Sequence, residues 1–257
     1  MQAFSFSIRH LCTTLAALKH TRMNNESFDQ TVLEVRSDTA SGAFITRTYA
    51  WMTLALCITA ATAFFTASSE VLLNFILGSR FVFFGLIIGE LLLVGALIAA
   101  VRKMSPTVAT LVFLGYSALN GLTLSVVLLA FTASSIFLTF LITAGTFAIM
   151  SIYGYTTKAD LTRLGNLALM ALVGVILASV VNMFMQSETL DWIISYLGVA
   201  IFVGLIAYDT QKLKDLSYSI DHESSEGKKA SLMGALTLYL DFINLFLFLL
   251  RLFGRRD

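Results

Sequence analysis

Residues 81–101 read FVFFGLIIGELLLVGALIAAV, and the only charged side chain in this run is that of Glu90. A helix needs about twenty predominantly apolar residues to cross a bilayer core roughly 30 Å thick. Similar runs occupy 49–67, 107–130, 135–152, 167–185, 192–211 and 234–253. The sequence therefore predicts an all-α integral membrane protein with seven transmembrane helices.

The composition supports the same class. Hydrophobic residues make up 57% of the chain and charged residues 13%, against roughly 45–50% and about 25% in soluble domains. The net charge of +1 gives no indication of a nucleic-acid partner. Cys12 and Cys57 have no metal-type neighbour and no plausible disulfide mate, so we expect them to pack as small apolar residues. The natural partner of this chain is the lipid bilayer.

The chain divides into two parts by composition. Residues 1–48 are polar and mixed, which predicts a largely disordered N-terminal tail, and residues 49–254 form the predicted seven-helix domain. The first 22 residues contain no acid, a bias that resembles a mitochondrial presequence. The alternative is that Met23 is the true start of the protein, or that the preceding residues are a disordered arm.

The Lys and Arg residues of the short loops predict the orientation. One side of the predicted bundle carries ten of them, and the other carries Arg80 and the C-terminal Arg251, Arg255 and Arg256. The N-terminus is therefore predicted to be cytoplasmic. The three C-terminal arginines leave open a re-entrant last helix with six true spans, although the length of run 234–253 favours seven.

Three acidic residues lie inside the apolar runs, namely Glu90, Asp209 and Asp241. A charged side chain at the centre of a membrane helix costs about 2.5–3.5 kcal/mol on insertion scales, so such groups normally face a protein interior or water. No Lys, Arg or His lies deep in any run. The acids must therefore be protonated, share protons, pair with a base at a helix end or bind cations. A pair of carboxylates would suit both proton exchange and Ca²⁺ binding.

Polar neighbours suggest an interior polar track. Asn244 follows Asp241 by three residues and so shares its helix face. Tyr208 and Tyr239 flank the acids and are expected to be ordinary residues of a membrane-interface aromatic belt. The connector at 153–165, rich in Thr, Gly and charged residues, is expected to be a structural turn whose Thr and Asp side chains cap helix ends.

Four segments of the chain are similar to the Bax inhibitor-1 family, also called the transmembrane Bax inhibitor motif family, and in particular to its bacterial inner-membrane members. These segments are GLTLS at 121–125, GYTTKADL at 154–161, AYDTQK at 207–212 and LYLDFINLF at 238–246. The resemblance implies six helices packed around a central C-terminal seventh. It also implies a multi-pass protein of the inner membrane.

The same resemblance implies a pH-sensitive calcium leak channel, with Ca²⁺ as the transported ion and no cofactor. Its gate would be a proton-sharing pair formed by Asp209 and Asp241, which would also be the metal-contacting residues. The family has an arginine on its second helix that pairs with the sixth-helix aspartate, and Arg102 is the nearest candidate although it lies at the end of its run. Glu90 corresponds to the acidic residue of that helix, so the gating or pairing candidates are Asp209, Asp241, Arg102, Glu90 and Asn244.

Three alternatives to the leak channel remain open, and the first of them is implied by the same resemblance. The first is a regulatory protein that modulates a membrane-bound protease or a stress response without transport. The second is a proton-driven transporter. The third, an intramembrane aspartyl protease, is disfavoured because Asp241 follows Leu-Tyr-Leu instead of the Gly-x-Gly of that signature, and because the sole proline, Pro106, precedes Thr107. We therefore expect no enzymatic activity.

Overall fold

The computed structural model describes residues 41–255, and these residues form helices and connecting turns without a strand. The first helix spans Ser41–Ala67. The others are α2 (Glu70–Leu77), α3 (Arg80–Ala100), α4 (Pro106–Leu128), α5 (Ala133–Thr156), α6 (Thr162–Met185), α7 (Glu188–Ser217) and α8 (Ser225–Phe253). All except α2 are long and apolar enough to cross a membrane, so the seven predicted spans are confirmed.

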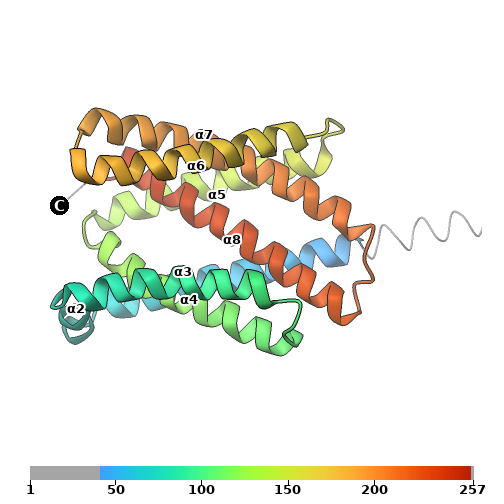
Figure 1. The fold of residues 1–257 in the computed structure, drawn as a ribbon, viewed down its shortest axis with the longest axis horizontal. Helices are drawn as coiled ribbons and strands as arrows, with labels where there is room; N and C mark the ends of the chain where they lie inside the picture. Colours follow the sequence, from blue (N-terminus) through green and yellow to red (C-terminus); the bar gives the residue numbers. More distant parts are fainter. Residues whose placement is uncertain (1–40, 256–257) are drawn as a thin grey trace, which may run out of the picture. The chain divides into compact units, whose positions relative to one another are not determined.

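Helix α8 is the central element of the unit formed by residues 44–257 (Figure 1). In its most apolar stretch 67% of the residues are buried, against 6% in α3 and 11% in α6. It packs against α4, α5 and α7, and its side chains also bond to the first helix. The predicted arrangement around a central seventh helix is therefore confirmed.

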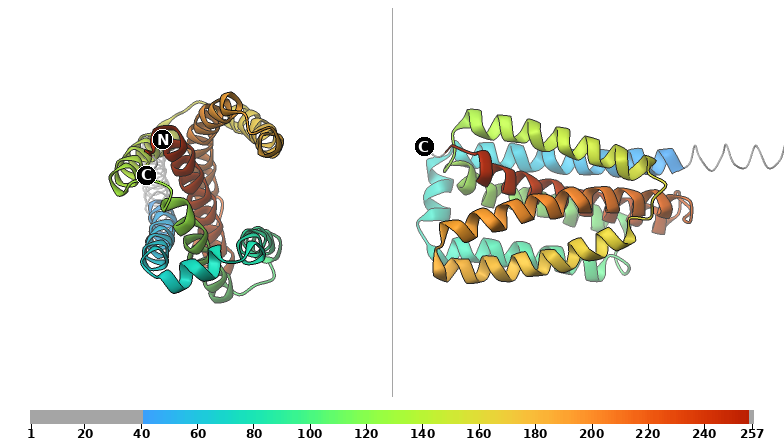
Figure 2. Two further views of the ribbon diagram at one scale, coloured as in Figure 1. Left: turned by 90° about the vertical axis from the view of Figure 1, so that its left-hand side faces the viewer. Right: turned by 90° about the horizontal axis from the view of Figure 1, so that it is seen from above.

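The remaining helices form hairpins beside α8. Helices α3 and α4 pack against each other, as do α6 and α7, and α5 contacts both α7 and α8. Figure 2 shows α3 and α4 on one side of α8 and α6 and α7 on another, when the helices are viewed end-on. The outer faces of α3 and α6 are apolar and exposed, which is the surface expected of helices that contact lipid.

Serine side chains fix several helix starts by accepting a hydrogen bond from a backbone N–H of the first turn, as N-caps do. Ser105 accepts from Val108 and starts α4, Ser187 starts α7 in the same way, and Ser224 starts α8. Pro106 occupies the first position of α4. That position needs no backbone N–H, so the single proline of the chain breaks no helix.

The helices extend beyond the apolar runs at several ends. The first helix begins at Ser41, so residues 41–48 are helical although the sequence placed them in the tail. The rest of the predicted tail, including Met23 and the acid-free first 22 residues, lies outside the described residues. The short helix α2, of eight residues and about 12 Å, was not predicted, because its apolar stretch is too short to span a bilayer.

Close helix approach occurs at glycines of α5 and α6, and not at the Gly-xxx-Gly spacing of α3, which is a common packing motif of membrane helices. Gly85 and Gly89, four residues apart on α3, have almost no neighbours within contact range of a hypothetical Cβ. A Cβ on Gly154 of α5 would overlap the carbonyl oxygen of Ala207, and one on Gly165 of α6 would overlap the ring of Tyr208. Helix α7 therefore packs closely against α5 and α6 at the two residues immediately before Asp209.

Candidate functional site: a carboxyl pair between two helices

The side chains of Asp209 on α7 and Asp241 on α8 meet, and each carboxyl group is a hydrogen-bond partner of the other. Asp241 is 5% exposed. No N–H or O–H group of the described residues donates to its Oδ2 atom, which is fully buried. A hydrogen bond between two carboxyl groups needs a proton on one of them, so the geometry brings together the two acids that the sequence singled out and suits a shared proton.

The surroundings of the pair are apolar on one side and basic at one edge. Ile206 and Ala207 precede Asp209 and are fully buried, as are Leu238 and Leu245 on α8. The charged neighbour that acts on Asp209 besides Asp241 is Lys212, one turn further along α7. Its ammonium group lies 5.8 Å from the centre of the Tyr208 ring. The two acids therefore have one basic neighbour, Lys212, near the end of α7. The middle parts of α7 and α8 contain no base.

Tyr239 lies two residues before Asp241, and so about 200° away around α8. It is fully buried, with its hydroxyl 2.8 Å from Oγ1 of Thr59 and its ring edge-on to Phe113 and Tyr116. The interpretation of Tyr239 as an interface residue was therefore wrong. The sequence did contain a signal for the buried position of Tyr239. A spacing of two residues turns Tyr239 away from Asp241, and so towards the first helix and α4.

Glu90 belongs to this second polar cluster and not to the carboxyl pair. The Thr123 hydroxyl on α4 donates to Oε1 of Glu90 on α3 at 2.5 Å. Asn120, one turn before Thr123, is a hydrogen-bond partner of Tyr116, and its Oδ1 atom is buried without a described partner. We call this set, Glu90, Tyr116, Asn120, Thr123, Thr59 and Tyr239, the tyrosine cluster. It lies across α8 from the aspartates.

Arg102 and Asn244 were the other candidates for pairing. Arg102 is exposed in the turn after α3, where its backbone oxygen accepts a hydrogen bond of 3.1 Å from Lys229 Nζ. The described residues include no ion pair between Arg102 and Asp209, and the nearby base is Lys212 instead. Asn244 donates to Leu240 O of its own helix at 2.8 Å and lines a cavity beside α8. The structure brings neither residue into the pair.

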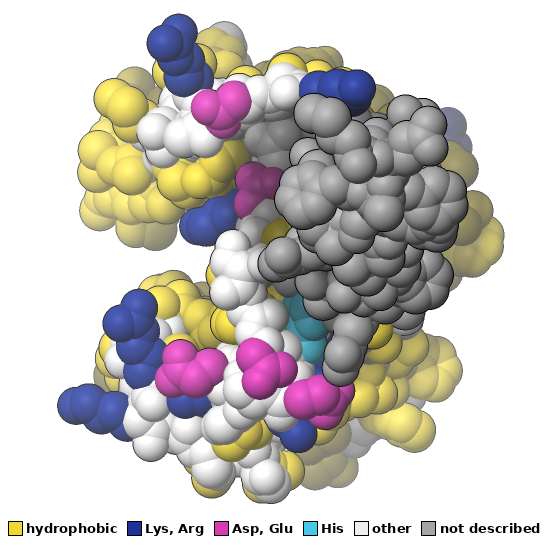
Figure 3. All heavy atoms as spheres, turned by 90° about the vertical axis from the view of Figure 1, so that its right-hand side faces the viewer, with side chains coloured by type: hydrophobic (Ala, Val, Ile, Leu, Met, Phe, Trp, Pro, Cys, Tyr) yellow, Lys and Arg dark blue, Asp and Glu magenta, His cyan; other side chains and the backbone are white. Residues whose placement is uncertain are grey.

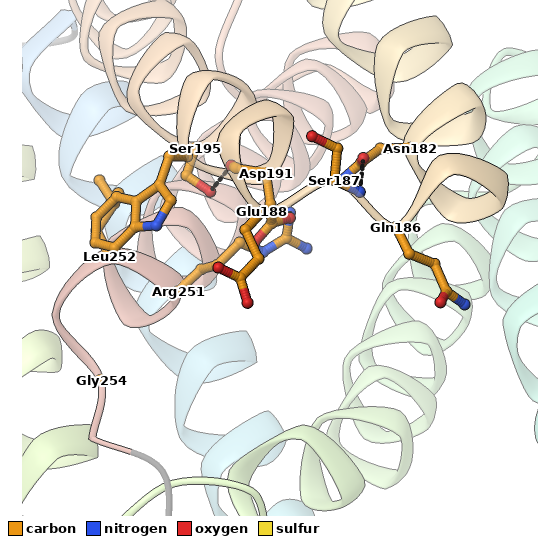
Figure 4. Close-up of a pocket in the computed structure, with 10 residues that line it drawn as sticks. Asn182, Gln186, Ser187, Glu188, Asp191, Ser195, Arg251, Leu252 and Gly254 are labelled. Carbon is orange, nitrogen blue, oxygen red and sulfur yellow. Dashed lines mark hydrogen bonds and ion pairs between the residues drawn. The ribbon is translucent and has the colours of Figure 1, made fainter.

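A polar cavity of about 610 Å³ lies at the end of the bundle where α6 turns into α7 and α8 ends (Figure 4). Arg251 and Asp191 line it and form an ion pair at 3.3 Å, with both side chains about two-fifths exposed. Asn182 Oδ1 accepts a hydrogen bond from the backbone of Ser187, which holds the α6–α7 turn. Arg251, which the charge count left without a role, thus has a partner on α7.

Two smaller cavities continue from this polar one towards the middle of α8. The first, of about 180 Å³, shares Asn182, Asp191 and Arg251 with it and adds Ser179. The second, of about 460 Å³, shares Ser179 and reaches Asn244, one turn along α8 from Asp241. Neighbouring cavities that share lining residues therefore lie between the Arg251 end of the bundle and Asn244, and the one at Asn244 is lined mostly by apolar side chains.

The opposite end of the bundle carries the α5–α6 connector and the α7–α8 loop, and Lys and Arg side chains surround it (Figure 3). The connector is bound to α7 by Gln211, a residue that the sequence did not identify as a contact. Asp160 accepts a hydrogen bond from the backbone of Thr162 at 2.9 Å and so caps the start of α6, as predicted for this segment. Hydrogen bonding by the side chain of Thr162, and then by its backbone N–H, lowers the pKa of the Asp160 carboxyl.

The carboxyl pair offers two acidic ligands to a cation. Within the described part of the chain, no group of three or more His, Cys, Asp or Glu side chains lies close enough to hold a metal ion. A calcium ion at the pair would complete its six to eight oxygen ligands with water or backbone carbonyls.

Comparison with known proteins gives one consistent result. The family model described as inhibitor of apoptosis-promoting Bax1 matches residues 42–257. The inner membrane protein YbhL of Escherichia coli (strain K12) is 51% identical over 214 residues, which are 83% of this chain and 92% of YbhL.

Two uncharacterized proteins, one from Borreliella burgdorferi and one from Deinococcus radiodurans, are each 43% identical over 83% of this chain. The matches cover 92% and 91% of those proteins. The matched region contains all seven spans and both aspartates. This chain is therefore a multi-pass membrane protein that belongs to the Bax inhibitor-1 family.

Proposed function

We propose that this protein is a cation leak channel of the inner membrane, that Ca²⁺ is its transported ion, and that the Asp209–Asp241 pair is its pH-sensitive gate. The observation that carries the proposal is the direct contact between two carboxyl groups from different helices, one of them almost fully buried. The inner-membrane location agrees with the name of the relative YbhL.

The gating step follows from simple electrostatics. Two unit charges about 4 Å apart repel by about 4 kcal/mol at an effective dielectric constant of 20. At low pH one proton held between the carboxyl groups removes this repulsion and bonds α7 to α8. As the pH rises the proton leaves, the two carboxylates repel, and the contact between the helices changes. The pair is therefore a switch whose two states differ in the packing of the central helix.

The neighbouring cavities support an ion route on one side of this switch. Asp191, Asn182 and Ser179 bring oxygen atoms to the cavities at the Arg251 end, and Ser179 and Asn244 are the polar side chains of the mostly apolar cavity beside the middle of α8. Carboxylate, amide and hydroxyl oxygens are the ligands that Ca²⁺ accepts. The carboxyl pair stands between this route and the end of the bundle with the α5–α6 connector.

The distribution of charge supports an orientation. The α3–α4 turn, the α5–α6 connector, the end of α7 and the start of α8 lie at one end, and together they carry the residues Arg102, Lys103, Lys158, Arg163, Lys212, Lys214, Lys228 and Lys229. Cytoplasmic loops carry the excess of Lys and Arg. This end, and with it the N-terminus, is cytoplasmic in our proposal, and the Arg251 cavity opens on the outer side.

The test is calcium flux into liposomes that contain the purified protein, measured at two pH values with K⁺ and Na⁺ as competing ions. Asn cannot ionise, so Asp209→Asn and Asp241→Asn should each remove the pH dependence of flux. Asp215→Asn is the matched control, because Asp215 is an exposed carboxyl on the same helix. Wild-type pH dependence in both Asn variants would overturn the gate, and the absence of wild-type flux would favour the regulatory alternative.

A further inference from the structure

The connector between α5 and α6 is held against α7 by a single amide side chain. The backbone N–H of Leu161 donates to Oε1 of Gln211 at 2.9 Å, and Nε2 of Gln211 donates to the carbonyl oxygen of Ala159 at 2.8 Å. One side chain thus satisfies a donor and an acceptor of the connector backbone. Both groups lie about fifty residues before Gln211 in the sequence, so this is a tertiary contact.

A lysine one turn later adds a third bond. Nζ of Lys214 donates to the carbonyl oxygen of Tyr155 at 2.8 Å, and the same ammonium group lies 5.1 Å from the centre of the Tyr155 ring. Tyr155 belongs to the last turn of α5, whose carbonyl groups have no partner within the helix. Lys214 therefore closes the end of α5 and ties it to α7.

Two glycines bring the backbones close enough for these bonds. Gly154 sits against the carbonyl oxygen of Ala207, and Gly165 sits against the ring of Tyr208, with no space for a Cβ in either case. The contacts at 207, 208, 211 and 214 fall on α7 around Asp209. Gln211 lies two residues after Asp209, about 200° around the helix, so α7 presents one face to the connector and another to α8.

From this arrangement we propose that the α5–α6 connector is a clamp. It holds the face of α7 that carries Gln211, on the other side of the helix from Asp209, and so sets the separation of Asp209 from Asp241. Gln211 is its main positioning residue and Lys214 its second. This inference rests on the proposed gating role of the aspartate pair. It assigns a role to residues 154–161, which the sequence marks as distinctive and which the carboxyl pair itself does not use.

The clamp is tested with Gln211→Ala, Gln211→Glu and Lys214→Met in the full-length protein. Glu keeps an acceptor for Leu161 and loses the donor to Ala159, so its effect should fall between those of Gln and Ala. Asn74→Ala, an exposed amide on α2, is the matched control. The first readout is hydrogen exchange of the Leu161 amide, which Gln211→Ala should accelerate about tenfold, as two lost hydrogen bonds of modest net strength would do.

The second readout is the infrared C=O band of the protonated carboxyl group, assigned by its disappearance in Asp241→Asn. Loss of the clamp should shift or broaden this band in Gln211→Ala, less in Gln211→Glu and not in Asn74→Ala. The third readout is calcium flux at one fixed pH, which should change in the same order. These measurements separate positioning of Asp209 from a merely structural contact.

The outcomes are distinguishable. Faster exchange at Leu161 together with an unchanged carboxyl band and unchanged flux would overturn the clamp as a positioning device. If the wild-type protein carries no calcium, the proposed function fails, while the amide and carboxyl readouts still decide whether the connector positions Asp209. If Gln211→Ala does not fold, Lys214→Met provides the same three readouts with one bond removed.

Discussion

The Tyr239 hydroxyl lies 2.8 Å from Oγ1 of Thr59, on the face of α8 that points away from Asp241. Near its middle, the central helix therefore makes polar contacts on two different faces: Tyr239 contacts the first helix, and Asp241 contacts α7. Their separation means that each can be changed without direct damage to the other, and this yields a pair of predictions.

Tyr239→Phe should destabilise the protein without removing the pH dependence of flux. The variant keeps the edge-on ring contacts with Phe113 and Tyr116 and loses one buried hydrogen bond, which costs about 1 kcal/mol. Thermal unfolding in detergent would measure the loss, and liposome flux at two pH values would test the gate. A variant that is stable but insensitive to pH would show that the two faces of α8 are coupled.

Thr123→Val should be more harmful than Glu90→Gln. Valine has the shape of threonine but leaves Oε1 of Glu90 without its donor, and a lost hydrogen bond to a charged or strongly polar group costs about 1.5–3 kcal/mol. Gln at position 90 keeps a side-chain oxygen for Thr123. Unfolding temperatures of the two variants give the comparison. The reverse order would mean that the charge of Glu90, and not its bond to Thr123, matters to the fold.

Gly154→Ala should loosen the contact between α5 and α7. The new methyl group would overlap the carbonyl oxygen of Ala207, and overpacking of this kind costs about 1–3 kcal/mol. Gly145→Ala is the control on the same helix, because a Cβ there meets nothing within 4 Å. We expect the control to be neutral or slightly stabilising, since Ala favours helix over Gly. Equal stability of the two variants would contradict the close approach at Gly154.

The cap of α6 should weaken in acid. The bond between Asp160 and Thr162 lowers the pKa of the Asp160 carboxyl, so its contribution to stability is fully present at neutral pH and is lost as the pH falls through that lowered value. Asp160→Ala should remove the cap at every pH, and Asp160→Asn should largely keep it because Asn also accepts at helix starts.

Hydrogen exchange of the Thr162 amide measures this cap directly. We expect fast exchange in Asp160→Ala at neutral pH and slow exchange in the wild type and in Asp160→Asn. Protection in the wild type that does not decrease in strong acid, after correction for the intrinsic exchange rate, would show that the carboxylate is not the source of the cap.

The sequence predicted the parts of this protein that depend on local composition. Seven apolar runs became seven spans, and the cost of an acid in hydrocarbon singled out Glu90, Asp209 and Asp241. That Asp209 and Asp241 form a pair was implied by the family resemblance and not by composition. The short helix α2 was missed because its apolar stretch is too short to span a bilayer, and the helical residues 41–48 were missed because polar and mixed segments carry no membrane signal. Helix ends that leave the bilayer follow capping rules, which are weaker guides than hydropathy.

Long-range contacts were the part that the sequence could not supply. The Gln211 contact joins residues about fifty positions apart, and nothing near Gln211 identifies its partner. Gly85 and Gly89 illustrate the same limit, because their spacing allows close packing in membrane helices and the structure leaves them open. The separation of Tyr239 from Asp241 was accessible, since a turn of 100° per residue places them on different faces.

The deep burial of α8 also has a consequence for biosynthesis. Helix α8 is synthesised after the other six spans. These six therefore enter the membrane before the helix that fills the centre of the bundle is present. Because α8 fills the centre of the bundle, the spans that precede it cannot complete their packing until α8 has entered the membrane.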